Sequence, residues 1–170
     1  SVKVWIEEST IMIFIDCEFN GFGGELITMA LVADDGREFY VDIFSHNEYP
    51  TDFVTTNVLP VIDVPGAESR PISKTFLPQA ISKFLSYYGS VHLVADWPDD
   101  IKYFCEALMT GPGERVDTPP LAMEIVRIDG DSEVPHNALC DARGIRDAYQ
   151  RAYPDSVIIE KLTEDDIVYK

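Results

Sequence analysis

The sequence predicts an α/β fold in which helices flank a mixed five-stranded sheet. Two observations favour this class. The first part of the chain carries three apolar segments joined by short turns, as in an antiparallel meander. The second part alternates helix and strand patterns, as in a sheet with parallel strands. No repeat or low-complexity linker divides the chain, so we expect one domain over 1–170 with its core at about 11–153.

The predicted meander begins with a continuous β-branched and aromatic run at 10–15, which is typical of a strand buried on both faces. A glycine-rich loop at 20–24 separates it from a second strand over 25–33. Asp-Asp-Gly at 34–36 is a strong hairpin turn. The third strand, 37–44, shows clear alternation of apolar and polar residues.

Segment 45–71 is rich in proline and carries a short helical pattern over 52–59. Ser73 then caps an amphipathic helix that reaches about residue 88 and ends at Gly89. The side chains predicted for one side of this helix are those of Phe76, Ile81, Phe84 and Leu85.

The rest of the chain alternates strands and helices. An apolar segment at 91–95 predicts a short buried strand, and Pro98 opens a helix over 99–109 with acids in its first turn. A further strand is predicted at 121–128. The last long helix spans 137–153.

The chain is strongly acidic, with a formal net charge of −17 from 13 Lys and Arg against 30 Asp and Glu. Proteins that grip long nucleic acids are usually basic, because phosphate contacts dominate their affinity. Metal ions in a carboxylate site would offset part of this charge. The charge therefore favours short strands or chain ends as partners over a long, tightly held nucleic acid.

Cysteine usage and hydropathy indicate the compartment. Cys17, Cys105 and Cys140 are odd in number and show no Cys-x-x-Cys spacing, so we expect reduced, buried thiols. No apolar segment reaches the roughly 18 residues that span a bilayer. The sequence starts without a basic, apolar leader, so we expect a cytoplasmic location and no membrane partner.

Two carboxylates follow directly on the first buried strand. Side chains alternate along a strand, so Asp16 and Glu18 are expected on the same face. There they repel each other and lose solvation, and a divalent cation is the usual compensation. Alone, the pair is also compatible with a strand that runs into a solvated turn.

Further acids occur at two later positions. Asp96, Asp99 and Asp100 lie where a buried strand enters a helix, although one of them could cap the helix while the others are surface charge. His136 follows Pro135 and is expected in a loop, from which it can approach a site that Asp141 faces from the helix. The alternative is a core Asp beside a surface His. Residues 129–133 superficially suggest calcium but lack the remaining ligands, so a polar turn is expected.

These motifs form one ordered pattern: Asp-Cys-Glu-Phe at 16–19, Glu-Leu-Ile at 25–27, Asp-Gly-Arg-Glu-Phe at 35–39 and His-Asn-Ala-Leu-Cys-Asp-Ala-Arg at 136–143. In them the chain resembles the DEDDh 3'-5' exonucleases, the family of ribonuclease T, oligoribonuclease and the proofreading exonucleases. It is most similar to the compact mycobacterial-type bacterial 3'-5' exoribonucleases, over about 11–153. The resemblance implies a ribonuclease H-like fold and a homodimer.

The resemblance also implies site residues. The four metal-binding acids would be Asp16, Glu18, Asp100 and Asp141, with His136 as general base. The middle motif departs from the common pattern, in which Asn and an aromatic residue precede the acid. Asp100 is favoured because residues 101–104 continue the helix behind it, and Asp96 is the alternative.

Phosphodiester hydrolysis needs an activated water, neutralised phosphate charge and a stabilised leaving oxygen, which two Mg²⁺ or Mn²⁺ ions can supply. Hard cations select oxygen ligands, which suits carboxylates. Asp16 would bridge the ions, and Asp100 would bind one of them largely through water. Glu18 and Asp141 would hold the water-activating ion. His136 would take the proton from that water, since imidazole titrates near neutral pH.

The expected reaction is release of 5'-mononucleotides (nucleoside monophosphates) from the 3' end of single-stranded RNA. Phe19 and Leu26 are candidates to stack on the terminal base, with core packing as the alternative. Arg143 and Lys102 are candidates for phosphate contacts, or else surface residues. Two other functions stay open: an exonuclease that acts on DNA, and a non-catalytic binder of nucleotides or nucleic acid on the same fold.

Overall fold

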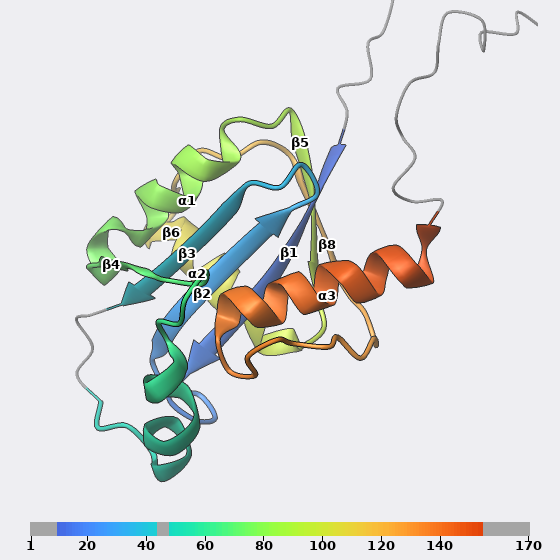
Figure 1. The fold of residues 1–170 in the computed structure, drawn as a ribbon. Helices are drawn as coiled ribbons and strands as arrows, with labels where there is room; N and C mark the ends of the chain where they lie inside the picture. The colour runs from blue at the N-terminus through green and yellow to red at the C-terminus, as the bar shows by residue number, and fades with distance from the viewer. Residues whose placement is uncertain (1–9, 44–47, 155–170) are drawn as a thin grey trace, which may run out of the picture.

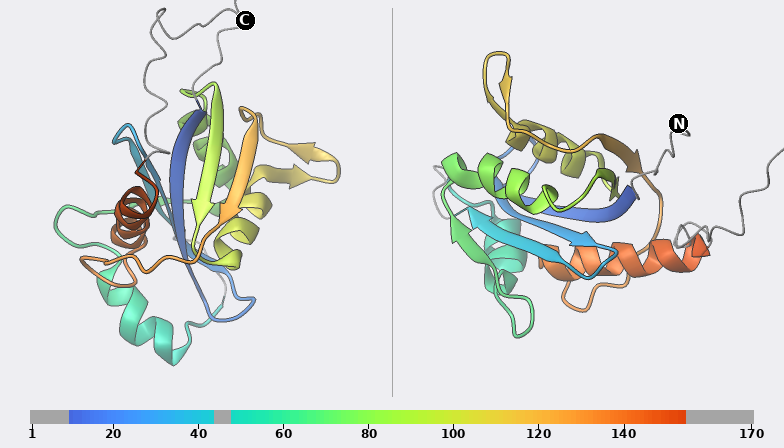
Figure 2. Two further views of the ribbon diagram at one scale, coloured as in Figure 1. Left: turned by 90° about the vertical axis from the view of Figure 1, so that its right-hand side faces the viewer. Right: turned by 90° about the horizontal axis from the view of Figure 1, so that it is seen from above.

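The fold is known from a computed structural model that describes residues 10–43 and 48–154. A mixed six-stranded sheet, in the order β4-β3-β2-β1-β5-β8, forms the middle layer. Helices α1 and α2 cover one face of the sheet, and α3 crosses the other face (Figures 1 and 2). The predicted class, a mixed sheet flanked by helices, is confirmed, but the predicted number of five strands is wrong.

The predicted antiparallel meander is present at the centre of the sheet. It consists of β1 (Thr10–Phe19), β2 (Leu26–Ala33) and β3 (Glu38–Ile43). The turn between β2 and β3 places Gly36 at φ +90°, a conformation that glycine adopts at little cost. Residue 44, the predicted end of the third strand, lies outside the described residues.

Two later strands extend the sheet in parallel. The predicted strand at 91–95 is β5 (Ser90–Ala95), which pairs parallel with β1. Strand β8 (Leu121–Ile125) pairs parallel with β5 and ends before the predicted residue 128. It ends early because Val126 and Ile128 leave the sheet to pack with residues of α3.

The strand that sequence analysis missed is β4 (Arg70–Ile72), which pairs parallel with β3 at the edge of the sheet. It contains Pro71, which cannot donate to a strand ladder and argues against a strand in the sheet interior. An edge strand tolerates it. A small hairpin of β6 (Met109–Gly111) and β7 (Glu114–Arg115) was also not predicted.

The predicted helix that Ser73 caps starts as a 3₁₀ turn, Lys74–Phe76, and continues as α1 (Leu77–Leu85). The Ser73 side chain accepts a hydrogen bond from the Thr75 backbone. The inner face is Leu77, Ile81 and Leu85, spaced four residues apart, with Phe84 partly buried. Phe76 was predicted on this face but is 65% exposed, because it belongs to the tighter turn before the α-helix.

The other predicted helices lie close to their expected bounds. They are a short π-helix at Val54–Val58 followed by a 3₁₀ turn at Leu59–Val61, then α2 (Pro98–Leu108) and α3 (Ala138–Ala152). Across 10–43 and 48–154, the structure has no helix with the length and apolar character to cross a membrane. All three cysteines are free thiols; Cys17 and Cys140 are buried as expected, whereas Cys105 is partly exposed.

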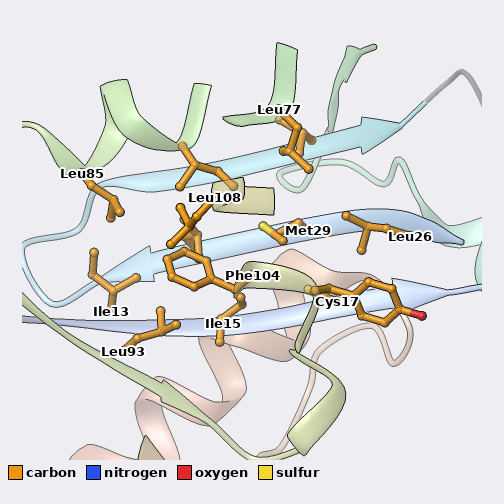
Figure 3. Packing of buried hydrophobic residues seen from close by; sticks show 14 of the residues in the cluster. Ile13, Ile15, Cys17, Leu26, Met29, Leu77, Leu85, Leu93, Phe104 and Leu108 are labelled. Carbon is orange, nitrogen blue, oxygen red and sulfur yellow. The ribbon is translucent and has the colours of Figure 1, made fainter. Parts of the chain in front are cut away.

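The core is divided between the two faces of the sheet. On one face, Ile13, Ile15 and Cys17 pack with side chains of α1 and α2, among them Leu85 and Phe104 (Figure 3). On the other face, residues of even number in β1 pack with α3. Side chains alternate between the two faces along a strand, so the next even-numbered residues of β1, Asp16 and Glu18, also lie on the α3 side.

Candidate metal centre

The candidate site lies at the carboxyl ends of β1 and β5. These strands are neighbours and parallel, so their carboxyl ends meet at the same edge of the sheet. The chain leaves β5 into α2 on one face, and α3 begins on the other face. Both helices carry an acid in the first turn, Asp100 in α2 and Asp141 in α3, where the helix dipole favours negative charge.

One group of acids joins β1 to the start of α2. Carboxylate oxygens of Asp16, Asp96 and Asp100 lie within 4.8 Å of one another. Asp100 is only 1% exposed, and its Oδ1 accepts a hydrogen bond of 3.0 Å from the backbone N–H of Cys17. Asp100 Oδ2 and Asp16 Oδ2 are buried without a hydrogen-bond partner. Buried carboxylate oxygens without partners are costly, and they indicate a missing cation or proton.

A second group joins the end of β1 to the start of α3. Single ligand atoms of Glu18, His136 and Asp141 lie within 4.8 Å of one another. His136 Nδ1 is 3.9 Å from Glu18 Oε1. The backbone N–H of His136 donates to Asp141 Oδ2 at 3.0 Å. The five residues that the sequence predicts for catalysis are therefore brought together at one edge of the sheet, and Asp96 joins them.

His136 has an unusual backbone. It is the only non-glycine residue with a positive φ, +69°, among those that the structure describes. This left-handed conformation costs on the order of 1–2 kcal/mol for an L-residue. Such strain persists only where the surroundings fix it, and it is concentrated at functional sites. Here the conformation aims the backbone N–H at Asp141 and leaves the imidazole beside Glu18.

Asn137 fixes this segment from the next position. It is fully buried, and its Oδ1 accepts from the Cys140 N–H as the N-cap of α3. Its amide nitrogen donates to backbone carbonyls in the 3₁₀ turn and the loop that follows, those of Val61, Ile62 and Ala67. The start of α3, and with it the His136 loop, is thus tied to a segment seventy or more residues earlier in the chain.

The acids share a poorly solvated region, and their pKa values respond to it. Burial, reinforced by Asp100 and the other acids, raises the pKa of Asp16 well above its ordinary value. Burial, with repulsion from Asp141 and Asp100, raises the pKa of Glu18 to about 8. Burial likewise raises the pKa values of Asp96 and Asp141. Burial and mutual repulsion thus disfavour the ionised form of each of these acids.

The donor set fits a hard divalent cation. Five carboxylates face one region, and oxygen ligands of this kind suit Mg²⁺ or Mn²⁺. In residues 10–43 and 48–154, no Lys or Arg forms an ion pair with any of these five acids. The unpartnered oxygens of Asp16 and Asp100 are the positions where a cation would be most stabilising.

The predicted substrate-binding residues have other contacts. Phe19 packs against Tyr103 with ring centroids 4.9 Å apart and is partly buried, and Leu26 is buried in the core. Leu26 and Lys102 both line a hollow of about 440 Å³. Arg143 is held by Glu38, at 2.7 and 3.0 Å, and by the carbonyl of Gly66. A role in substrate binding stays a prediction for each of these residues, and Arg143 would have to exchange existing partners.

The loop 129–133 forms no metal cluster within the part of the chain that the structure describes. Its glycine serves packing: a side chain at Gly130 would meet the Gly144 backbone at 2.9 Å, so only glycines allow the loop to lie this close to α3. Residues 129–132 have no regular secondary structure and no assigned turn, so the expected polar turn is not seen there.

Three residues of the site were missed or left open. Asp96 was weighed only as an alternative to Asp100, whereas both contribute to the cluster. Asn137 carries a recognisable N-cap signal, an Asn directly before the helix pattern. Phe53 lies edge-on to His136 with ring centroids 5.2 Å apart and is 55% exposed. No local pattern could have placed Phe53 here, since eighty-three positions separate the two residues.

Comparisons with known proteins find no matching family model and no match among curated proteins. The residues and geometry of this chain therefore carry its functional assignment.

Proposed function

We propose that this chain is a divalent-metal-dependent 3'-5' exoribonuclease of the DEDDh family, built on a ribonuclease H-like fold. It would hydrolyse single-stranded RNA or 3' overhangs to 5'-mononucleotides in the cytoplasm. The observation that carries the proposal is the meeting of two acid groups at the carboxyl end of β1, with unpartnered buried oxygens on Asp16 and Asp100. The mixed sheet order, with a central antiparallel meander and parallel outer strands, is compatible with that fold.

Two Mg²⁺ or Mn²⁺ ions, when bound, would neutralise phosphate charge, activate a water and stabilise the leaving oxygen. Asp16, Asp100, Glu18 and Asp141 are the residues that would hold them. His136, beside Glu18 and Asp141, is the residue that would act as general base. Its Nδ1 faces Glu18, which leaves Nε2 to accept the proton of the attacking water. The hydrogen bond from its backbone N–H to Asp141 holds the His136 backbone at the site.

The surroundings of the site favour a chain end as substrate. The acids carry no Arg or Lys partners in the described ranges, and the whole chain has a charge of −17, so a long phosphate backbone would be poorly held. Exposed Phe53 beside His136 offers an apolar ring on which a base can stack without regard to sequence. The implied homodimer stays a prediction that sedimentation would check.

The proposal is tested with a 5'-labelled RNA that carries a 3' overhang, and with a DNA oligomer of the same sequence. We expect shortening from the 3' end that requires Mg²⁺ or Mn²⁺, stops with EDTA and releases 5'-mononucleotides. His136→Ala should slow hydrolysis at pH 7 by about a hundredfold or more, as expected for a general base. Arg146→Ala, a change at the surface ion pair with Asp147, is the matched control.

Three results would revise the proposal. Faster loss of the DNA oligomer would favour a DNA exonuclease with the same site. Oligomer or nucleotide binding without turnover, at saturating Mn²⁺, would favour a non-catalytic binder. An unchanged rate for His136→Ala at pH 7 would remove His136 from its role as base.

A further inference from the structure

The segment from the end of β5 to the first turn of α2 carries three acids, of which two face the candidate site and one does not. Asp96 follows the last residue of β5, and Asp100 lies in the first turn of α2. Both contribute an oxygen to the group that includes Asp16. Asp99 instead accepts a hydrogen bond of 2.6 Å from the indole of Trp97, which is 58% exposed. Two of the three acids therefore face the site, and one is engaged at the surface.

The convergence of Asp96 and Asp100 follows from the local backbone. Trp97 is extended, with φ −133° and ψ 138°, and it is the residue before the first turn of α2. Asp96 thus lies directly after the end of β5, and the first turn of α2 brings Asp100 close to it. One carboxylate oxygen each of Asp16, Asp96 and Asp100 lies within 4.8 Å of the others. The sequence pattern suggested Asp96 and Asp100 as alternatives for one role. In the structure both are present at the same point, Asp96 from the end of the strand and Asp100 from the helix.

An independent feature marks this point as a ligand position. Asp100 Oδ1 is satisfied by the Cys17 N–H, but Oδ2 has no partner on a side chain that is 1% exposed. Asp16 Oδ2 is likewise buried without a partner, although Asp16 as a whole is partly exposed. The group around Glu18 is different: all three of its residues are partly exposed, neither of its two carboxylates has a buried oxygen without a partner, and its third member is the imidazole of His136.

Building on the proposed function, we infer that Asp96 is a direct third carboxylate ligand beside Asp16 and Asp100. This makes the Asp16–Asp96–Asp100 position the tighter of two unequal cation positions. Three carboxylates in a poorly solvated place attract a divalent cation more strongly than Glu18 and Asp141 at the more exposed position, because ligand charge sets affinity. The first ion would therefore bind without substrate, and the second would bind more weakly.

The test is titration of the full-length protein with Mn²⁺ alone, followed by the electron paramagnetic resonance signal of free Mn²⁺. The wild type should show two binding steps. Asp96→Asn should weaken the tighter step by at least about tenfold, the lower end of what loss of even an outer-shell partner costs a metal site. Asp99→Asn is the matched control: it also replaces one carboxylate by an amide, three positions after Asp96, and it should leave both binding steps unchanged. Glu18→Gln should affect only the weaker step.

The outcomes separate this inference from the proposed function. Wild-type protein that binds no Mn²⁺ would overturn both. Two steps in the wild type, with Asp96→Asn indistinguishable from Asp99→Asn, would overturn only the role of Asp96. Asp96→Glu keeps the carboxylate and should retain most of the tight step. Should Asp96→Asn fail to fold by circular dichroism, Asp96→Ser takes its place with the same expected loss.

Discussion

The two faces of β1 differ sharply, although they belong to one strand. The face toward α1 and α2 is apolar along its whole length, with Ile13, Ile15 and Cys17 inside the main core. The face toward α3 is apolar only as far as Phe14 and then turns acidic. The alternation of a strand therefore lets adjacent residues serve packing and chemistry separately. One face supplies stability, and the end of the other face carries a destabilising cluster that a cation can compensate.

The largest effect is expected at the acidic face. Asp16→Asn should lower RNA hydrolysis at saturating Mg²⁺ by about a hundredfold to a thousandfold, as loss of one central electrostatic group does in other active sites. Since the pKa of Asp16 is raised by burial and by neighbouring acids, the same change should also raise the melting temperature of the metal-free protein. Rates and thermal melts measure the two effects, with Asp99→Asn as the matched control. A normal rate would contradict the assignment of Asp16.

The adjacent residue on the other face should give the opposite result. Ile15 is fully buried among side chains of the main core, so Ile15→Ala should lower the free energy of unfolding by about 2–5 kcal/mol. Denaturant titration measures this loss. The folded fraction should hydrolyse RNA at close to the normal rate. A large loss of rate per folded molecule would mean that the two faces are not independent.

The pH dependence of the free energy of unfolding tests whether burial raises the pKa values of the acids at the site. Without metal, folded Glu18 has a pKa of about 8 against an ordinary value of 4.5, so unfolding releases a proton between these values. The free energy of unfolding should therefore fall as the pH rises from about 4.5 to 8. Glu18 alone should account for a fall of up to about 5 kcal/mol, at about 1.4 kcal/mol for each pH unit between its two pKa values.

Glu18→Gln should reduce this slope, because it removes one of the acids whose pKa is raised, while the other buried acids still contribute. Added Mn²⁺ should reverse the trend, since a cation binds the ionised acids and its stabilising effect grows with pH. Denaturant titrations at several pH values, with and without Mn²⁺, measure both effects. A metal-free protein whose stability rises over this range would contradict the raised pKa values.

A smaller effect is expected where α3 begins. Asn137→Ala removes the N-cap and three hydrogen bonds to backbone carbonyls, and it should cost about 1–2 kcal/mol. Because Asn137 follows His136 directly, the change should also lower the hydrolysis rate while the weaker Mn²⁺ step changes little. Asn57→Ala, at a partly exposed helix position, is the control. Equal effects of the two changes would remove the positioning role of Asn137.

Local patterns predicted most elements and the acids of the site. The strand β1, the N-terminus of α2 and the start of α3 each carry their own signal: an apolar run, a proline followed by acids, and an Asn before a helix pattern. Alternation placed Asp16 and Glu18 on one face correctly, because it depends only on strand geometry.

Features that depend on distant partners could not be predicted in this way. Strand β4 exists through its pairing with β3, against the preference of Pro71. Arg143 pairs with Glu38 across 105 positions, and the edge contact of Phe53 with His136 joins segments 83 positions apart. That Asp96 and Asp100 both face the site depends on how α2 returns to β1, which no spacing rule shows.

The most direct test of the central claim is anomalous X-ray diffraction from crystals of the wild-type protein grown with Mn²⁺. The account predicts two anomalous peaks at the carboxyl end of β1, one among Asp16, Asp96 and Asp100 and the other beside Glu18 and Asp141. Density that shows the same acids without any bound ion at saturating Mn²⁺ would contradict it, and their buried oxygens would then be satisfied by protons alone.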